Sequence, residues 1–212
     1  MSTRQTIKSI IEREWDQFQH TNNEGGRASC QGNRPMFEVM RASQFAAWPQ
    51  ELLTSYLADL READAGGRNL VTEKYARMMA STAPEIYARD LEPHLPRLSE
   101  ARIAQQERII KRQLAWAHEF ADRYPALGAG MRVLDTAEDS ETTTSFETYL
   151  RGELATYSQR TLDLYERFVR ECERRQENLT EQIIANTVRL GGYTNLDEAE
   201  AAQRRAKARM SR

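Results

Sequence analysis

Residues 99–124, SEARIAQQERIIKRQLAWAHEFADRY, decide the fold class of this chain. Ser99 is a residue type that is favoured at helix N-termini. The apolar residues after it recur at the spacing of one helical face: Ile103, Ile110, Leu114, Ala117 and Ala121. We therefore predict a long amphipathic helix from Ser99 to about Tyr124, with this face turned toward the core.

The same spacing continues over most of the chain. It predicts helices over roughly 3–19, 33–44, 49–65, 70–81, 144–175 and 178–190, a short helix from Pro84, and a terminal helix capped by Asn195. No segment shows the alternation of a strand. The predicted fold class is all-α, a single-domain bundle of about seven to nine helices with a Gly-rich loop near residue 25 and a long loop near residues 125–143. Residues 1–193 are expected to form this domain, and 194–212 a C-terminal helix with a basic tail.

The charge balance excludes some classes of partner. The chain contains 30 Lys and Arg residues and 32 Asp and Glu residues, which gives a formal net charge of −2. A binder of nucleic acid or of an anionic membrane needs a clear basic excess. No apolar run approaches the ~20 residues of a membrane span, no signal peptide is evident, and two cysteines are too few for a disulfide framework. We expect a cytoplasmic protein with reduced thiols.

The Gly-rich loop at residues 22–33 has the composition of an anion site. Gly25 and Gly26 permit backbone N–H groups to converge, and Arg27 adds a guanidinium suited to a carboxylate or phosphate. The same surroundings would lower the pKa of Cys30. No histidine of the chain completes a recognisable Cys/His signature, so Arg27 and the glycine N–H groups are the stronger prediction, ahead of Cys30 as a nucleophile.

Several polar residues lie on helix faces that should be buried. Glu14, Gln44, Glu107 and Glu147 fall on or near the apolar stripes of their helices. A buried carboxylate must be paired, hydrogen-bonded or protonated. The predicted partners are Arg41, Lys74 and Arg151, either as structural ion pairs or as the lining of a polar cavity between helices.

Glu73 and Arg77 fall on the opposite face of the predicted helix 70–81 from Val71, Tyr75 and Met79. Their spacing predicts an ordinary i,i+4 pair at the surface.

No metal or cofactor is predicted. The chain has no Glu-x-x-His motif for a di-iron bundle, no zinc-ligand spacing, and neither the phosphate loop nor the dinucleotide fingerprint.

Four blocks of sequence resemble an uncharacterised bacterial family, the domain of unknown function 4125. They are Asn23–Gln31, Met40–Trp48, Gly67–Met79 and Thr144–Leu154. The resemblance extends to about Tyr193 and implies a stand-alone bacterial cytosolic protein without an established activity. It also draws attention to Arg68 and Asn69 as a second anion-binding entrance, and to Glu73 and Arg77 as members of a family block.

The hypothesis that follows is a small enzyme whose interhelical polar pocket takes an anionic or zwitterionic, amino-acid-like metabolite for lyase, isomerase or group-transfer chemistry. Glu147 would move a proton with Cys30 or Tyr149 assisting. Arg27, Arg41 and Arg151 would hold acid groups, and Glu24 or Glu153 an amine. The remaining binding residues are Gly26, Gln31, Gln44, Arg68, Asn69 and Lys74.

The alternative is a non-catalytic helical module that binds a ligand in this pocket or a partner protein at the acidic 125–143 loop. Neither function involves nucleic acid or a membrane, and the sequence also allows a homodimer.

Overall fold

The computed structural model describes residues 1–21 and 29–210, apart from the side chains of residues 29, 30 and 210. Over these residues the chain forms eleven α-helices and no strand, with one isolated bridge between Ser140 and Thr143. The predicted all-α class is confirmed. Within the described part, no helix is both long and apolar enough to cross a membrane.

The helices have the following bounds: α1 Thr3–Gln19, α2 Arg34–Ala46, α3 Gln50–Ala65, α4 Leu70–Thr82, α5 Pro84–Ile86, α6 Glu100–Arg123, α7 Pro125–Gly128, α8 Phe146–Thr156, α9 Gln159–Arg174, α10 Leu179–Leu190 and α11 Leu196–Met210. A π turn (Tyr87–Leu91) and a 3-10 turn (Glu92–His94) continue α5. Two further 3-10 turns cover Ser29–Gly32 and Thr136–Glu138.

Side-chain caps set most of the helix starts. The Asn or Ser before a helix accepts a hydrogen bond from a backbone N–H of its first turn, and this N–H has no carbonyl partner within the helix. Such caps occur at Ser2, Asn33, Asn69, Ser99, Ser145, Ser158, Asn178 and Asn195. The cap residues Ser99 and Asn195 were predicted from the sequence alone.

The predicted helix 144–175 is wrong, because it is two helices. Tyr157 adopts an extended backbone, and Ser158 caps the start of α9. The backbone N–H of Ser158 donates to a carboxylate oxygen of Asp59 on α3 at 2.9 Å. This division, together with the one-turn helix α7, raises the number of helices above the predicted seven to nine.

The segment after α7 is folded back against the start of α8. The N–H groups of Phe146 and Glu147 donate to the carbonyl oxygens of Val133 (2.8 Å) and Leu134 (3.1 Å). Asp139 accepts hydrogen bonds from Ser81 on α4 and from Ser145 and Thr148 at the start of α8. The long loop therefore joins α4 to α8.

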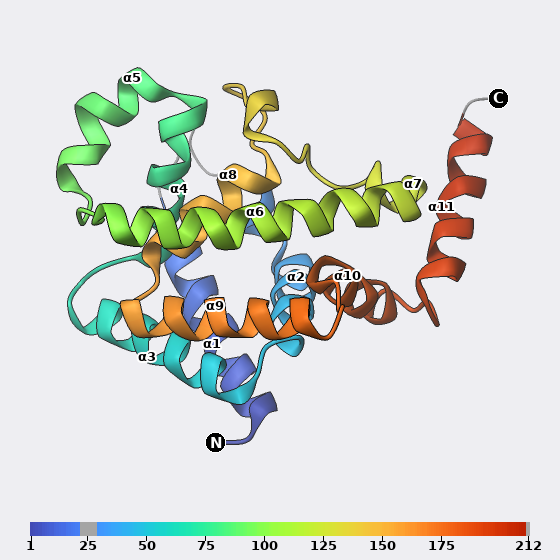
Figure 1. Cartoon of the computed structure of the whole chain (residues 1–212), viewed down its shortest axis with the longest axis horizontal. Coiled ribbons are helices and arrows are strands. Elements are labelled where there is room, and N and C mark those ends of the chain that lie inside the picture. The colour runs from blue at the N-terminus through green and yellow to red at the C-terminus, as the bar shows by residue number, and fades with distance from the viewer. Residues whose placement is uncertain (22–28, 211–212) are drawn as a thin grey trace.

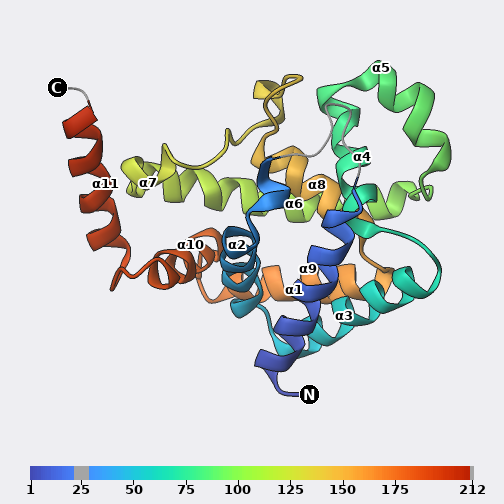
Figure 2. The same cartoon turned by 180° about the vertical axis from the view of Figure 1, so that it is seen from behind.

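Two hydrophobic clusters hold the helices together. The larger one contains side chains from α1, α2, α3, α4, α6, α8, α9 and α10. The smaller one joins α6, α10 and α11 through Phe120, Val188, Leu196 and Ala199. In Figures 1 and 2, α11 accordingly stands at one end of the molecule, beside α7 and α10.

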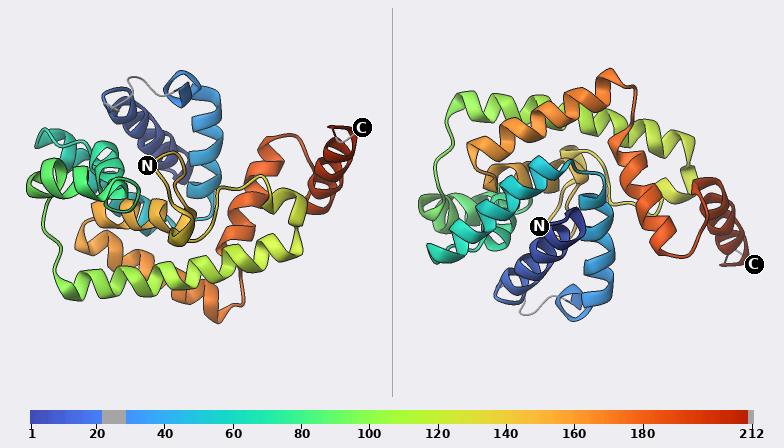
Figure 3. Two further views of the ribbon diagram at one scale, coloured as in Figure 1. Left: turned by 90° about the horizontal axis from the view of Figure 1, so that it is seen from above. Right: turned by 90° about the horizontal axis from the view of Figure 1, so that it is seen from below.

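Helix α8 occupies the interior of the arrangement. Viewed from above, α1 and α2 lie on one side of it and α6 on the other (Figure 3). Helix α4 packs on α8, and a Cβ added to Gly152 would lie 2.9 Å from the Lys74 carbonyl oxygen. Glycine at position 152 therefore permits this close approach.

The buried face of α6 is turned relative to the predicted stripe. It carries Gln105, Gln106, Ile109, Ile110, Gln113, Trp116, Ala117 and Phe120. Ile103, which was expected in the core, is 44% exposed. The prediction failed because three glutamines occupy the buried face, so apolarity alone misplaces its centre.

Candidate functional site

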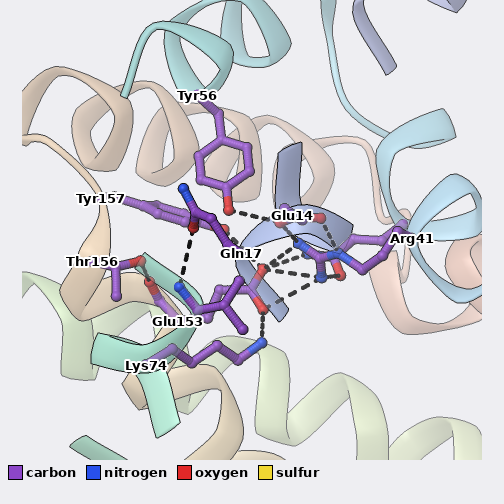
Figure 4. A network of polar contacts seen from close by, with 10 residues as sticks. Glu14, Gln17, Arg41, Tyr56, Lys74, Glu153, Thr156 and Tyr157 are labelled. Carbon is purple, nitrogen blue, oxygen red and sulfur yellow. Dashed lines mark hydrogen bonds and ion pairs between the residues drawn. The ribbon is translucent and has the colours of Figure 1, made fainter. Parts of the chain in front are cut away.

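Four charged side chains from four helices meet in the interior, and we call them the charge cluster: Glu14 of α1, Arg41 of α2, Lys74 of α4 and Glu153 of α8 (Figure 4). Arg41 binds Glu14 with two nitrogens, the Nε–Oε2 distance being 2.7 Å. Its guanidinium also lies 3.4 Å from Glu153. Lys74 Nζ donates to Glu153 Oε2 at 2.6 Å. The two carboxylates and the two cations give the charge cluster a formal net charge of zero.

Neutral polar groups complete the hydrogen bonding of the charge cluster. The Tyr56 hydroxyl donates to Glu14 at 2.7 Å, and the Tyr157 hydroxyl to Glu153 at 3.1 Å. Gln44 accepts from Arg41 at 2.7 Å and donates to Glu153 at 2.9 Å. Arg41 thus pairs with Glu14, one of the acids predicted to face inward, whereas Lys74 pairs with Glu153, which the sequence pattern had not placed on a buried face.

Burial and pairing act in opposite directions on these groups. Burial would raise the pKa of Glu153, but Arg41 and Lys74 outweigh it and hold the pKa well below its ordinary value. Burial would lower the pKa of Arg41, and Glu14 and Glu153 raise it instead. For Lys74 burial prevails over Glu153, so its pKa lies below the ordinary value.

The space beside the charge cluster is small. A cavity of about 30 Å³ is lined by its four residues and by Tyr149, among others. Such a volume accommodates a water molecule, so a metabolite enters this cavity only if the side chains around it move. Lys74 Nζ and the Arg132 guanidinium lie 3.5 and 4.4 Å from the centre of the Tyr149 ring.

A much larger space lies on another side of α8, and we call it the outer groove. It is bounded by α4, residues 84–98, α6 and α8, with a volume of about 870 Å³. That is within the range of about 300–1,000 Å³ typical of ligand pockets. Its lining includes Arg77, Tyr87, Leu95, Ile103, Arg151 and Ala155.

Arg151 is fully engaged at one end of the outer groove. It binds both carboxylate oxygens of Glu107 at 2.7 and 3.0 Å, Glu147 at 2.7 Å and the Thr136 hydroxyl at 3.1 Å. Glu147 also accepts the N–H of Thr136 at 2.8 Å. Burial opposes ionisation of Glu147, but these hydrogen bonds hold its pKa below the ordinary value. Glu147 is therefore ionised at neutral pH, without the raised pKa of a general acid.

The hydrogen bonding of Arg77 differs from that of Arg151. Its Nη2 donates to the Pro96 carbonyl at 2.6 Å, while its buried Nε has no hydrogen-bond acceptor among the described residues. Burial lowers the pKa of Arg77. The predicted surface pair with Glu73 is wrong, because Glu73 instead binds Arg68 with both oxygens at 2.8 Å. Arg77 turns toward the outer groove.

Arg102 adds a second positive charge near Arg77. Burial and the charge of Arg77 both lower its pKa. Arg102 donates to the carbonyl oxygens of Leu154 and Tyr157 and to Gln159. Over the described residues, neither Arg77 nor Arg102 has a carboxylate within ion-pair distance, and the more distant acids only partly offset the lowering of the two pKa values.

The single pocket expected from the sequence is divided between these two places. Arg41 and Arg151 line different cavities. The reason is helix geometry: Arg151 and Glu153 are two residues apart, so they point about 200° apart around α8. Arg151, one of the three candidate partners, does pair with Glu147 one turn before it on α8, at 2.7 Å.

A family model described as "Protein of unknown function (DUF4125)" matches residues 4–201. The chain belongs to this family. No curated protein and no solved structure matches the chain.

The sequence blocks on which the DUF4125 resemblance rested contribute to both places. The charge cluster takes Arg41 from the second block, Lys74 from the third and Glu153 from the fourth, and Gln44 of the second block donates a hydrogen bond to Glu153. The outer groove takes Arg77 and Arg151 from the third and fourth.

Other residues predicted for the DUF4125 site have different positions. Glu24, Gly26 and Arg27 lie outside the described residues, as does the side chain of Cys30. Gln31 is buried and donates to the carbonyl oxygens of Phe18 (2.6 Å) and Thr21 (3.0 Å). Asn69 caps α4 and donates to the Gln17 carbonyl at 2.7 Å.

Sequence reasoning missed Arg102 and misjudged Arg77. No motif marks Arg102, since its position near Arg77 depends on the packing of α6 beside α8. For Arg77 the family block was the available signal.

Proposed function

We propose that this DUF4125 member is a binding module that takes a small anionic molecule into the outer groove, with Arg77 as its main anchor. The proposal develops the anionic class of ligand expected from the sequence. It moves the anchor from the Gly-rich loop to α4.

The positive charge of Arg77 in the groove lining carries this proposal: Arg102, which lies near it outside the lining, adds to that charge, and neither has a carboxylate within ion-pair distance among the described residues. Bringing two guanidinium groups together away from solvent is unfavourable unless an anion compensates them. Guanidinium groups match carboxylates and phosphates through paired N–H donors. A ligand that supplies the missing negative charge would therefore be stabilised at this end of the groove.

Binding is favoured over catalysis because the other charged groups of the site are already engaged. Arg151, Glu107 and Glu147 form a closed set of ion pairs, and Glu147 is held in its ionised form. The described lining of the outer groove thus offers an anchor for a ligand without a group poised for proton transfer.

The enzymatic hypothesis remains a second candidate at the charge cluster, and one observation favours it. Lys74 lines the small cavity, and burial lowers its pKa. A lysine with a lowered pKa can attack a carbonyl compound, with loss of water, to form an imine. Incubation with pyruvate and sodium borohydride would then add mass to Lys74, with Lys74→Met as the control. An unchanged mass rules out this candidate.

Calorimetric titration with the sodium salts of acetate, benzoate and octanoate, and with inorganic phosphate, tests the binding proposal. At least one of these anions should bind, and Arg77→Gln should weaken that binding roughly 10- to 100-fold, since hydrogen bonds to charged groups contribute about 1.5–3 kcal/mol. Arg167→Gln is the matched control, because Arg167 is exposed on α9 and does not line the groove. Equal affinity in the wild type and Arg77→Gln, or no binding of any of the four, contradicts the proposal.

We further propose that the protein is of bacterial origin and is located in the cytoplasm. The nearly balanced charge and the two cysteines support it.

A further inference from the structure

The wall of the outer groove contains an apolar side chain that helix periodicity would place in a core. Ile103 is 44% exposed and faces the groove. Exposed apolar surface inside a concave site is a usual mark of a ligand that covers it. Ile103 therefore points to a ligand with an apolar part.

Ile103 is not alone on this surface. Leu95 and Leu98 approach from the segment that follows α5, Ala80 from α4 and Ala155 from α8. Together with Ile103 they come from three neighbouring segments between residues 80 and 103 and from the distant helix α8. Their convergence forms an apolar surface inside the groove.

The polar groups lie at the two ends of this surface. On α6, Arg102 precedes Ile103 and lies near Arg77 but does not itself line the groove, whereas Glu107 lines it and binds Arg151. Arg102 and Glu107 are five positions apart, which is about 7.5 Å along the helix axis. The cations of the lining at the Arg102 side are Arg77 and Arg97, and Arg97 follows Pro96, whose carbonyl oxygen accepts a hydrogen bond from Arg77. The groove thus has a cationic end, an apolar middle, and an end where the charges are already paired.

This asymmetry restricts the charge of the ligand. Among the described residues of the lining, the cationic end at Arg77 lacks a carboxylate partner, while Glu92 and Glu107 also line the groove. A second negative charge further along the ligand would meet the apolar surface or an acid. A single acid group attached to an apolar body fits this distribution.

We infer that the ligand is a small amphipathic carboxylic acid. Its carboxylate binds Arg77, and its alkyl or aryl body covers Ile103, Leu98 and Ala155. This inference rests on the proposed function, because it names the class of anion that the groove takes.

A chain-length series tests the inference. The probes are acetate, butanoate, hexanoate and octanoate, titrated into the full chain by calorimetry, with octylamine as a probe that has the same tail and the opposite charge. Affinity should rise up to about fourfold for each added methylene that is buried. Octylamine should not bind.

Two substitutions separate the apolar contribution from the anionic one. Ile103→Ser should weaken octanoate severalfold and leave acetate unchanged, whereas Ala80→Trp should exclude octanoate by filling the groove. Leu190→Ser is the matched control, since Leu190 is 56% exposed and does not line the groove. It should bind octanoate like the wild type.

The outcomes distinguish the inference from the proposal on which it depends. Equal affinity for all four acids, still abolished by Arg77→Gln, overturns the amphipathic ligand and leaves anion binding intact. Binding of octylamine as tight as that of octanoate also overturns the inference. If the wild type binds none of the anions, the proposed function itself is contradicted.

Discussion

Lys74 Nζ lies 2.6 Å from Glu153 Oε2, and this ion pair joins α4 to α8. The same two helices carry Arg77 and Ala155, which line the outer groove on another side of the pair. The charge cluster therefore fixes the spacing of two walls of the groove. We expect substitutions of Lys74 or Glu153 to act mainly on the stability of the folded protein.

Glu153→Gln should destabilise the protein more than Lys74→Met. Glu153 is shared by Arg41 and Lys74, so its loss leaves two buried cations facing one remaining acid. Breaking a buried ion pair from one side typically costs about 3–5 kcal/mol. After Lys74→Met, Glu153 still accepts hydrogen bonds from Gln44 and Tyr157 and lies beside Arg41.

Urea denaturation of the two variants checks this order. Glu38→Gln serves as the control, because Glu38 forms an exposed pair with Arg34 and should change stability by less than about 1 kcal/mol. A larger loss for Lys74→Met than for Glu153→Gln would show that the shared role assigned to Glu153 is incorrect.

Glu153 should also make the stability of the folded protein depend on pH in the acidic range. Its pKa in the folded chain lies well below the value of about 4.3 expected in the unfolded chain. A carboxylate with a depressed pKa stabilises the folded state fully above the unfolded pKa and loses this contribution as the pH falls. The free energy of unfolding should therefore decrease below about pH 5.

Glu153→Gln removes one titrating group from this dependence. The slope of the unfolding free energy against pH should become smaller by up to about 1.4 kcal/mol per pH unit between pH 4 and pH 2. Denaturation curves at half-unit steps measure the slope. If the slopes of wild type and variant coincide, Glu153 does not titrate abnormally.

Gly152→Ala should destabilise the contact between α4 and α8. The added Cβ would lie 2.9 Å from the Lys74 carbonyl oxygen and 2.9 Å from Met78 Cγ. Relieving this overlap requires the helices to separate, at a cost of about 1–3 kcal/mol. Thermal unfolding measures it, with Gly32→Ala as the control because a Cβ on Gly32 would meet no atom of the described residues within 4 Å. Equal stability of the two variants would refute the close approach.

The sequence predicts helices well where a cap residue marks the start, as Ser99 and Asn195 show. It fails at Tyr157–Ser158, because the apolar spacing continues across the break. The hydrogen bond at the junction of the two helices, from the Ser158 N–H to Asp59, joins residues far apart in the chain. Helical periodicity contains no information about such a contact.

The candidate site shows the same division between local and long-range information. The partners Arg41, Lys74 and Arg151 could be named because buried acids require cations nearby. Their separation into two places was also present in the sequence, since residues 151 and 153 point to opposite sides of a helix. The outer groove itself could not be predicted, because Arg77, Ile103 and Leu98 meet only through the packing of α4, α6 and the segment between them.

Glu200→Gln should loosen α11 while the rest of the chain stays folded. The buried Glu200 carboxylate accepts the N–H groups of Ala126 (2.9 Å) and Leu127 (2.8 Å) at the start of α7, and Arg204 donates to it at 2.8 Å. A glutamine offers one acceptor oxygen, so one of the two N–H groups would face an amide NH₂. The unmatched donor and the lost ion pair should cost about 1–3 kcal/mol, confined to this end of the molecule. Hydrogen exchange measures the effect: protection should fall in α7 and α11 and remain unchanged in α8. A uniform loss of protection across α8 would mean that residues 194–210 are part of the main folding unit, contrary to the domain boundary expected near residue 193.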